Sequence, residues 1–286
     1  MHAVRKGEPG YPRRLMRYEK MPETLYYIGK LPDENRRTAA VIGARACSPY
    51  GRIQAFRYAD FLSRAGVQVI SGLAYGIDSE GHKGALEGPT PTFAVLGSGA
   101  DVCYPKSHRT LYERIVWNQG GILSPFAPGT MPQPWHFPQR NVIISALSDI
   151  ILIVEAREKS GTLSTVEAAL DMSKSVYAIP GAVNDELSAG CNRLIYEGAV
   201  IAWRPEVLLD EWCLSPISPE EQKKSRSGLT EEQKLVFGAL GSRPRSMDYL
   251  IRQTGLPSEK VGKYVVELCL MGCIKEVGRH YYVRQD

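Results

Sequence analysis

Two features are scarce in this 286-residue chain: paired cysteines and long apolar runs. The six cysteines are scattered, with no C-x-x-C pair among them. The longest apolar run, "DIILIVEA" at residues 149–156, is too short to cross a bilayer. The first residues, "MHAVRKGEPGYPRRL", contain no apolar signal core. These absences predict a reduced, cytoplasmic protein with no membrane segment.

A strong net charge and the common nucleotide-binding fingerprints are also missing. The net charge of +4 permits an anionic partner without requiring one. "EKSGTLST" at 158–165 lacks the spacing of a P-loop, and "GSGADV" at 97–102 stops short of G-x-G-x-x-G. No nucleophile–base set or metal-ligand cluster accompanies these motifs. We therefore expect no catalytic residue, no cofactor and no metal ion, and hence a binding protein rather than an enzyme.

Residues 38–212 repeat one rhythm, in which a short apolar run ends at Gly, Ser or Pro and a helical pattern follows. Alternation of this kind predicts a parallel sheet with helices on both faces, an α/β fold of extended Rossmann-like, doubly wound type. Residues 1–37 are mixed and Pro-bounded, and we expect an N-terminal extension packed on the sheet. The apolar runs are "AAVIGA", "VQVISG", "TFAVLGSG", "GILSP", "IILIVEA", "SVYAIPG" and "AVIAW".

The C-terminal part of the chain has a different pattern. Residues 213–228, "CLSPISPEEQKKSRSG", are rich in Pro, Ser and charge, which predicts a linker. In residues 229–286 we expect three short helices, "TEEQKLVFGAL", "SMDYLIRQTG" and "PSEKVGKYVVELCLMG", and then a hairpin around Gly278. Three helices and a hairpin predict a small winged-helix domain.

The segment "SGLAYGIDSEGHKGAL" at 71–86 raises the choice between catalysis and anion binding. Gly72 and Gly76 would let a ligand approach the backbone, and the N–H groups of the following helix would point at the same place. Asp78 stands where an N-cap belongs, and His82 lies four residues further along the helix. We favour a structural pair, in which these two side chains hydrogen-bond each other, over a catalytic one.

Other strand exits carry similar residues, because ligands of such sheets bind beyond the carboxyl ends of the strands. The arginines in "VIGAR" and "FPQRN" suit phosphate oxygens, and the phenylalanine before the second can stack on a base. Replacing either arginine should weaken binding without unfolding the domain. Each motif also has a structural interpretation, as a solvated arginine, a tight turn, a buried Phe with a capping Asn, or an ordinary helix cap. The candidate ligand-binding residues are Gly43, Arg45, Ser71, Gly72, Gly97, Ser98, Gly99, Phe137, Arg140, Asn141, Lys159, Ser160, Gly161 and Thr162.

Taken in order, these motifs resemble those of the DNA processing protein A (DprA/Smf) family over residues 11–212. The succession is "YP" at 11, "GAR" at 43, "SGLAYGIDSEGHKGAL" at 71, "GSGADVCYP" at 97, "FPQRN" at 137, "SGTLST" at 160 and "GCNRLIYEGA" at 190. The sequence departs from the family pattern at Ala44, Pro125 and Val142, where members usually carry Ser, Glu and a basic residue. These departures affect the detail of a DNA groove and not the order of the motifs.

The resemblance implies a single-stranded DNA-binding protein that forms homodimers, protects incoming strands and loads the RecA recombinase in natural transformation and recombination. An alternative is a nucleotide-binding or nucleotide-hydrolysing enzyme of similar fold, whose motif G-G-x-G-T-x-x-E supplies a catalytic Glu. Here Thr165 takes the position of that Glu, and the first carboxylate is Glu167, on a different side of the helix. A further alternative is a transcription regulator whose sheet senses a nucleotide while the winged helix reads duplex DNA.

Overall fold

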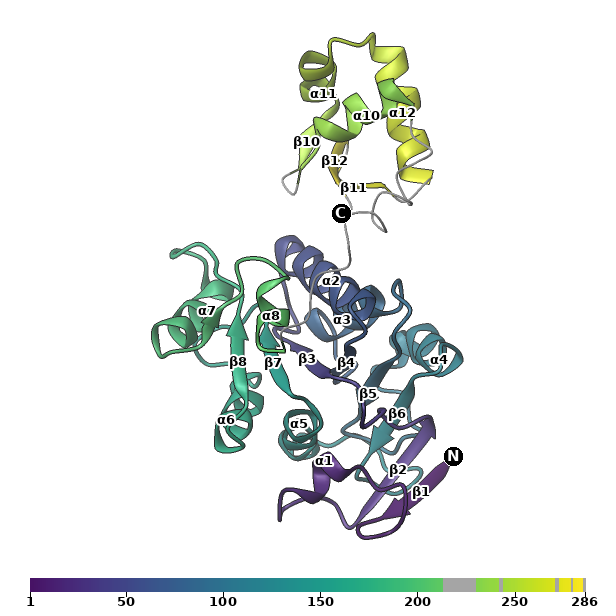
Figure 1. Ribbon diagram of the computed structural model, residues 1–286, viewed down its shortest axis with the longest axis vertical. Coiled ribbons are helices and arrows are strands. Elements are labelled where there is room, and N and C mark those ends of the chain that lie inside the picture. The colour runs from purple at the N-terminus through teal and green to yellow at the C-terminus, as the bar shows by residue number, and fades with distance from the viewer. Residues whose placement is uncertain (213–229, 242–243, 271–272, 279, 285–286) are drawn as a thin grey trace. The chain divides into compact units, whose positions relative to one another are not determined.

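The computed structural model describes residues 1–212, 230–241, 244–270, 273–278 and 280–284 (Figure 1). The chain forms two compact units, Met1–Pro216 and Ile217–Asp286, and each unit is treated by itself below. The predicted linker, 213–228, lies outside the described residues.

Nine strands of the described residues form one sheet in the first unit. They are β1 (His2–Arg5), β2 (Thr24–Gly29), β3 (Thr38–Ile42), β4 (Gln68–Ser71), β5 (Thr92–Val95), β6 (Gly121–Ser124), β7 (Ile150–Ile153), β8 (Ser175–Ala178) and β9 (Val200–Ile201). The order across the sheet is β1-β2-β6-β5-β4-β3-β7-β8-β9, and every pair from β6 to β9 is parallel. Each predicted apolar run contains one of these parallel strands, so the predicted fold class is confirmed.

Helices cover both faces of this sheet, with α2 and α3 on one face and α1, α5 and α6 on the other (Figure 1). The longest, α2, begins where Pro49 occupies the first helical position and the Ser48 side chain accepts a hydrogen bond from Gly51 N. The helices are α1 (Arg13–Met16), α2 (Pro49–Arg64), α3 (Ile77–Ala85), η1 (Lys106–His108), α4 (Arg109–Trp117), α5 (His136–Leu147), α6 (Leu163–Asp171), α7 (Glu186–Tyr196) and α8 (Val207–Asp210).

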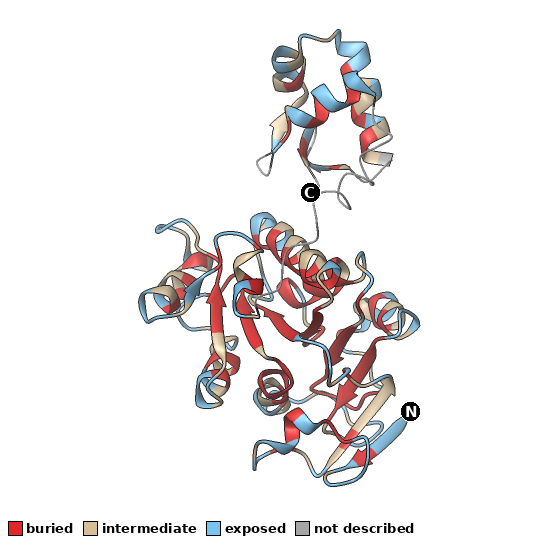
Figure 2. Ribbon diagram, viewed as in Figure 1, coloured by how far each residue is buried: buried red, intermediate tan, exposed pale blue. Residues whose placement is uncertain are grey.

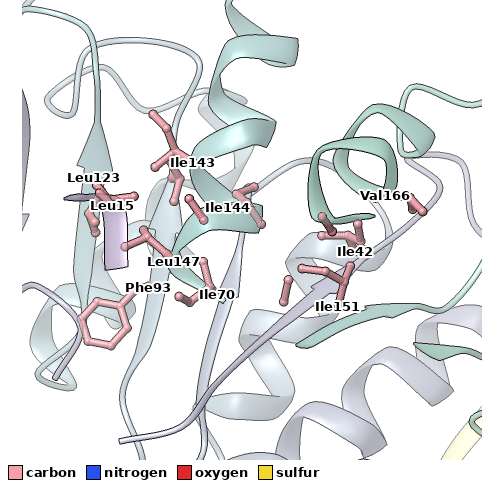
Figure 3. Close-up of a cluster of buried hydrophobic side chains, with 14 of the residues drawn as sticks. Leu15, Ile42, Ile70, Phe93, Leu123, Ile143, Ile144, Leu147, Ile151 and Val166 are labelled. Carbon is pink, nitrogen blue, oxygen red and sulfur yellow. The ribbon is translucent and has the colours of Figure 1, made fainter. Parts of the chain in front are cut away.

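The core follows from the alternation of side chains along each strand. In β3, Ala40 and Ile42 join the cluster that contains α5, whereas Ala39 and Val41 join the cluster that contains α2. Figure 2 shows the central strands buried, and Figure 3 shows the first of these clusters between the strands and α5. Full burial of one such aliphatic side chain stabilises the fold by about 1.5–3 kcal/mol. The two apolar layers therefore hold the strand ends, and the loops that leave them, in fixed positions.

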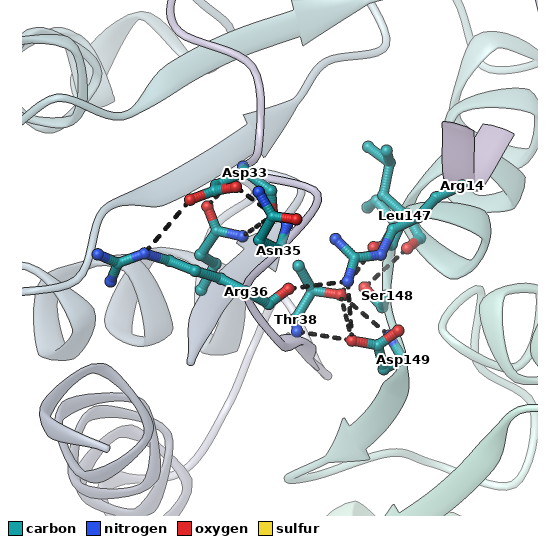
Figure 4. A network of polar contacts seen from close by, with 10 residues as sticks. Arg14, Asp33, Asn35, Arg36, Thr38, Leu147, Ser148 and Asp149 are labelled. Carbon is teal, nitrogen blue, oxygen red and sulfur yellow. Dashed lines mark hydrogen bonds and ion pairs between the residues drawn. The ribbon is translucent and has the colours of Figure 1, made fainter. Parts of the chain in front are cut away.

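The N-terminal segment extends the sheet instead of only packing on it. Strand β2 pairs antiparallel with β6, and β1 pairs antiparallel with β2. A polar network fastens this segment to the start of β3 (Figure 4). Arg14 donates to Arg36 O at 2.8 Å and pairs with Asp149 at 3.1 Å, and Asp149 accepts from Thr38 N at 2.9 Å. The extension and the parallel sheet thus form one body.

The second unit has the predicted three helices and hairpin. Helix α10 begins with a capping box between Thr230 and Gln233. Its core, which includes Val236, Leu250 and Val265, lies between the three helices. The elements are α10 (Glu231–Gly238), β10 (Arg245–Ser246), α11 (Met247–Thr254), α12 (Ser258–Leu270), β11 (Ile274–Gly278) and β12 (Tyr281–Arg284).

Candidate functional site

A pocket of about 880 Å³ opens at the carboxyl ends of the central strands. Strands β3 and β7 are neighbours there, although the chain leaves β3 for β4 on the other side. Such a topological switch point is where open α/β sheets place their ligands. The described residues that line the pocket come from the end of β3, from the loops after β3, β4, β5, β6 and β7, and from α3, α5, α6 and α7. They are Ile42–Ala46, Ala74, Asp78, Tyr104, Pro134, Phe137, Pro138, Arg140, Asn141, Ile144, Arg157, Lys159–Thr162, Ser164, Thr165 and Leu187.

Three cationic side chains of this pocket reach solvent. Arg45 and Lys159 are exposed, and Arg157 is exposed with Glu186 at 3.8 Å. Helix α6 begins at Leu163, so its positive end faces the same pocket. A concave site with several cations and a helix N-terminus favours an anion with more than one charge.

The loop that carries Arg45 is held at both ends by Glu155, a buried residue beyond β7. The backbone carbonyl of Glu155 accepts from Ala44 N at 2.8 Å. Its carboxylate accepts from Ser48 N at 2.9 Å and also from the Ser48 hydroxyl. A Cβ at Gly51 would lie 2.3 Å from this carboxylate, so any larger residue there would displace it. Glu155 therefore fixes the loop between β3 and α2 from which Arg45 projects.

Arg140 also lines the pocket and, like Arg45, lies near the Phe137 ring, but its side chain is buried. It is only 4% exposed and donates to Gly72 O at 2.6 Å and Val95 O at 2.5 Å. Burial lowers the pKa of its guanidinium to about 10, although the charge of Asp78 opposes this shift. Arg140 therefore ties the ends of β4 and β5 together. These contacts disfavour our expectation that Arg140 could be replaced without unfolding the domain, because the loss would leave buried carbonyls without a donor.

The predicted bond between Asp78 and His82 is also wrong. Asp78 lies inside α3, whose N-cap is Gly76, and its carboxylate accepts from Gly72 N at 3.1 Å and from Ala74 N. His82 is fully buried, and its Nδ1 lies 2.8 Å from Thr92 Oγ1. Burial raises the pKa of Asp78 and lowers that of His82 to about 3. Both side chains have structural partners, which agrees with the preference for a structural role over a catalytic one.

Five candidate residues lie behind the pocket instead of lining it. The hydroxyl of Ser71 donates to Val41 O at 2.7 Å, and that of Ser98 donates to Val102 O at 2.7 Å. A Cβ at Gly72 would lie 2.0 Å from the Arg140 guanidinium, and one at Gly97 would lie 2.9 Å from the Phe137 ring. Gly99 is likewise buried, with a Cβ position 2.7 Å from Asp101. Protein atoms already fill the space beside each of these three glycines, and both serine hydroxyls already donate to backbone carbonyls. The predicted phosphate contacts are therefore disfavoured at all five positions.

The other nine candidates line the pocket. Phe137 lies under the guanidinium of Arg45, whose Cζ is 4.8 Å from the ring centroid. Asn141 donates to Ser164 Oγ at 2.9 Å. The Ser160 hydroxyl lies 3.1 Å from that of Thr162, close to the start of α6. The remaining members of the group are Gly43, Arg140, Lys159 and Gly161. Direct ligand contact by these residues stays a prediction.

Sequence reasoning did not single out Arg157 or Tyr104, which also line the pocket. Arg157 directly follows the run that forms β7, so the strand-exit rule that selected Arg45 would have selected it too. Tyr104 is nine residues beyond β5, and no local pattern connects it with Phe137, whose ring centroid lies 6.0 Å from its own.

In the part of the chain that the structure describes, no group of three or more His, Cys, Asp and Glu side chains could hold a metal ion. None of the helices in this part of the chain is both long enough and apolar enough to span a membrane.

The fold and the site define a Rossmann-like α/β protein with a cationic pocket at its switch point, followed by a separate winged-helix unit. A family model described as DNA recombination-mediator protein A matches residues 2–212, and one described as DprA winged helix domain matches residues 220–278. The chain therefore belongs to the DprA/Smf family, as the order of its motifs predicted.

Individual relatives agree with this assignment. Protein Smf of Escherichia coli is 32% identical, over 98% of this chain and 76% of the relative. DNA processing protein DprA of Streptococcus pneumoniae is 39% identical, over 71% of each chain, and a solved structure of DprA from that species has a TM-score of 0.69 over 73% of this chain and 74% of its own. The structure of DNA processing protein A from Helicobacter pylori, which is described for a unique single-stranded DNA binding mode, has 26% identity and a TM-score of 0.65 over 73% of this chain and 95% of its own.

Proposed function

We propose that this protein binds single-stranded DNA in the pocket at the switch point. The observation that carries the proposal is the convergence of Arg45, Arg157, Lys159 and the start of α6 on one concave surface. Several cations spaced around a pocket suit successive phosphates better than a single small anion. The Helicobacter pylori relative, described for single-stranded DNA binding, supports the choice of polymer.

The pocket gives little support to the alternative of a nucleotide-hydrolysing enzyme. Asp78 is the one carboxylate among the described residues that line it, and that carboxylate already accepts two backbone N–H groups. Glu167, the first carboxylate after the predicted motif, is exposed on α6 and does not line the pocket. A general base needs a free oxygen within reach of a substrate proton, and neither group meets both conditions. The relatives from Streptococcus pneumoniae and Bacillus subtilis are likewise named as DNA processing protein DprA.

The wider role that we propose is to protect incoming strands and load the RecA recombinase in natural transformation and recombination. The family description, a recombination mediator, supports this role. RecA should therefore assemble faster on single strands pre-bound by this protein than on strands covered only by a competing single-strand binder. Equal assembly rates would contradict the loading step and leave single-strand binding intact. A cytoplasmic location belongs to the same proposal.

We further propose a homodimer. Strand β9 is the edge of the nine-stranded sheet, and its two residues are 42% and 44% exposed. Tyr196, at 91%, and Trp203, at 61%, flank this strand in the sequence. Exposed apolar side chains beside an open strand edge are a common basis of self-association. Analytical ultracentrifugation should show a dimer that Tyr196→Glu together with Trp203→Glu converts to a monomer.

The direct test of binding is a fluorescence anisotropy titration with a labelled single strand and with the duplex of the same sequence. We expect the single strand to bind more tightly. Arg45→Ala should weaken binding by about 1–3 kcal/mol, the contribution of one charged hydrogen bond. Arg64→Ala is the matched control, because Arg64 is half exposed at the far end of α2. Equal affinity for single strand and duplex would refute the proposal.

A further inference from the structure

Beside the pocket lies a second surface, formed by side chains that do not line the pocket. Tyr75 follows β4, and η1 with its neighbours follows β5. We use the term ledge for Tyr75, Lys106, Ser107 and His108. The Tyr75 ring is 51% exposed, although its neighbour Ala74 lines the pocket.

The ring of Tyr75 is held in place by the rest of the ledge. Ser107 Oγ donates to the Tyr75 hydroxyl at 3.0 Å, and the His108 ring meets the Tyr75 ring edge-on at a centroid distance of 4.9 Å. His108 Nδ1 donates in turn to Leu73 O at 2.9 Å. An aromatic ring that is fixed at its edge and hydroxyl and still half exposed can stack on a planar group with little further loss of entropy.

The backbone at this point is also unusual. Leu73 is fully buried and has a φ of +56°, a conformation that residues with a side chain rarely adopt. Such conformations cost about 1–3 kcal/mol and persist where the surrounding structure determines them, often at binding sites. The bond from His108 to the Leu73 carbonyl is part of that surrounding structure. The strained turn directs Tyr75 away from the core and toward solvent.

The ledge is continuous with the pocket. Tyr104 lines the pocket, is 44% exposed, and stands two residues before Lys106. Its ring centroid lies 6.0 Å from that of Phe137, inside the pocket. On the other side, Ala74 connects the pocket wall to Tyr75. A chain that leaves the pocket past Tyr104 therefore reaches the ledge directly.

The charge of the ledge suits a phosphate. Lys106 is exposed and forms no ion pair with any residue that the structure describes, whereas neighbouring Arg109 is paired with Glu113 at 2.7 Å. A cation next to an exposed aromatic ring is the combination that binds one nucleotide of a single strand, by phosphate and by base.

We propose that single-stranded DNA continues from the pocket over Tyr104 to the ledge, where a base stacks on Tyr75 and the adjoining phosphate meets Lys106. This proposal rests on the proposed function and adds a second subsite to it. Stacking does not depend on base identity, so the ledge extends the bound strand without adding sequence preference.

The test compares oligothymidines of two lengths, about four and about sixteen nucleotides, the range of site sizes known for single-strand binders. The short strand fills the pocket alone, and the long strand also reaches the ledge. Tyr75→Ala should weaken binding of the long strand by about tenfold, the effect of one lost stacking contact, and leave the short strand unaffected. Tyr75→Phe keeps the ring and should bind both strands as the parent does. Trp117→Ala is the control, since Trp117 is 72% exposed at the opposite end of α4.

Each outcome decides between the two proposals. If neither strand binds to the parent protein, the proposed function fails, and the ledge fails with it. If both strands bind but Tyr75→Ala weakens them equally, or not at all, the pocket stands and the ledge is refuted. If Trp117→Ala reproduces the loss for the long strand, the effect belongs to exposed aromatic residues in general, and the ledge is again refuted. Thermal unfolding of each variant shows whether it is folded.

Discussion

Replacing Arg140 by methionine should destabilise the first unit, because this buried side chain joins two strand ends. The change removes hydrogen bonds to Gly72 O at 2.6 Å and Val95 O at 2.5 Å, and one to Asn141 Oδ1 at 3.1 Å. It also removes the positive charge that acts on Asp78, a buried carboxylate. Methionine replaces the apolar stem of the arginine side chain but supplies no donor.

The expected loss is about 3–5 kcal/mol in the free energy of unfolding, the usual effect of removing one partner from a buried charged network. The assay is urea unfolding followed by circular dichroism. Arg45→Met is the matched control: Arg45 is exposed, so its replacement should change stability by no more than about 0.5 kcal/mol while weakening single-strand binding. If Arg140→Met unfolds at the same urea concentration as the parent, the structural role assigned to Arg140 is refuted.

Three further predictions concern Gly72, His82 and the winged-helix unit. Gly72→Ala should lower the free energy of unfolding by about 3 kcal/mol or more, since the new Cβ would lie 2.0 Å from the Arg140 guanidinium. Gly161→Ala is the control and should be neutral, because a Cβ at Gly161 would have no atom within 4 Å. Urea unfolding of both variants checks this. The pKa of His82 is about 3 in the folded protein and near 6.5 in the unfolded chain. Its contribution to the free energy of unfolding is therefore complete above pH 6.5 and is lost as the pH falls toward 3, by up to about 1.4 kcal/mol per pH unit. His82→Asn should remove this pH dependence when unfolding is measured from about pH 7 to 4. Truncation after Trp212 should leave single-strand affinity within about threefold of the full chain in anisotropy titrations. The reason is that α12 carries Lys260 and Lys263 against Glu259 and Glu267, so this helix offers no net positive charge, and Lys260 is paired with Glu232. A tenfold loss would contradict the prediction.

The position of the pocket could be predicted because it depends on the order of the strands and little else. Apolar runs locate the strands, and parallel strands bring their carboxyl ends to one edge of the sheet, so Arg45 and Lys159 meet although more than a hundred residues separate them. The direction of a side chain at that edge depends on packing that no local pattern records. Arg140 has the same residue type as Arg45 and lies at the same edge, yet it points inward because two strand-end carbonyls need a donor.

The N-terminal extension shows a second limit. The segments that form β1 and β2 have no clear period of two, and β2 pairs with β6 across about one hundred residues of sequence. Strand pairing at that separation is determined by the tertiary structure. Arg14 and Asp149, which form an ion pair, are also more than one hundred residues apart in the sequence, and no local sequence pattern predicts their contact.

The central claim, that the cations of the pocket bind the phosphates of a single strand, is tested most directly by the salt dependence of binding. A single-stranded oligonucleotide of about four nucleotides, too short to reach the ledge, is titrated by anisotropy at several salt concentrations between about 50 and 200 mM. With Arg45, Arg157 and Lys159 each neutralising one phosphate, the slope of log K against log salt should be about −2, and Arg45→Met should make it shallower by about 0.7. Affinity that does not change with salt, or an Arg45→Met variant with the slope and affinity of the parent, would contradict the claim.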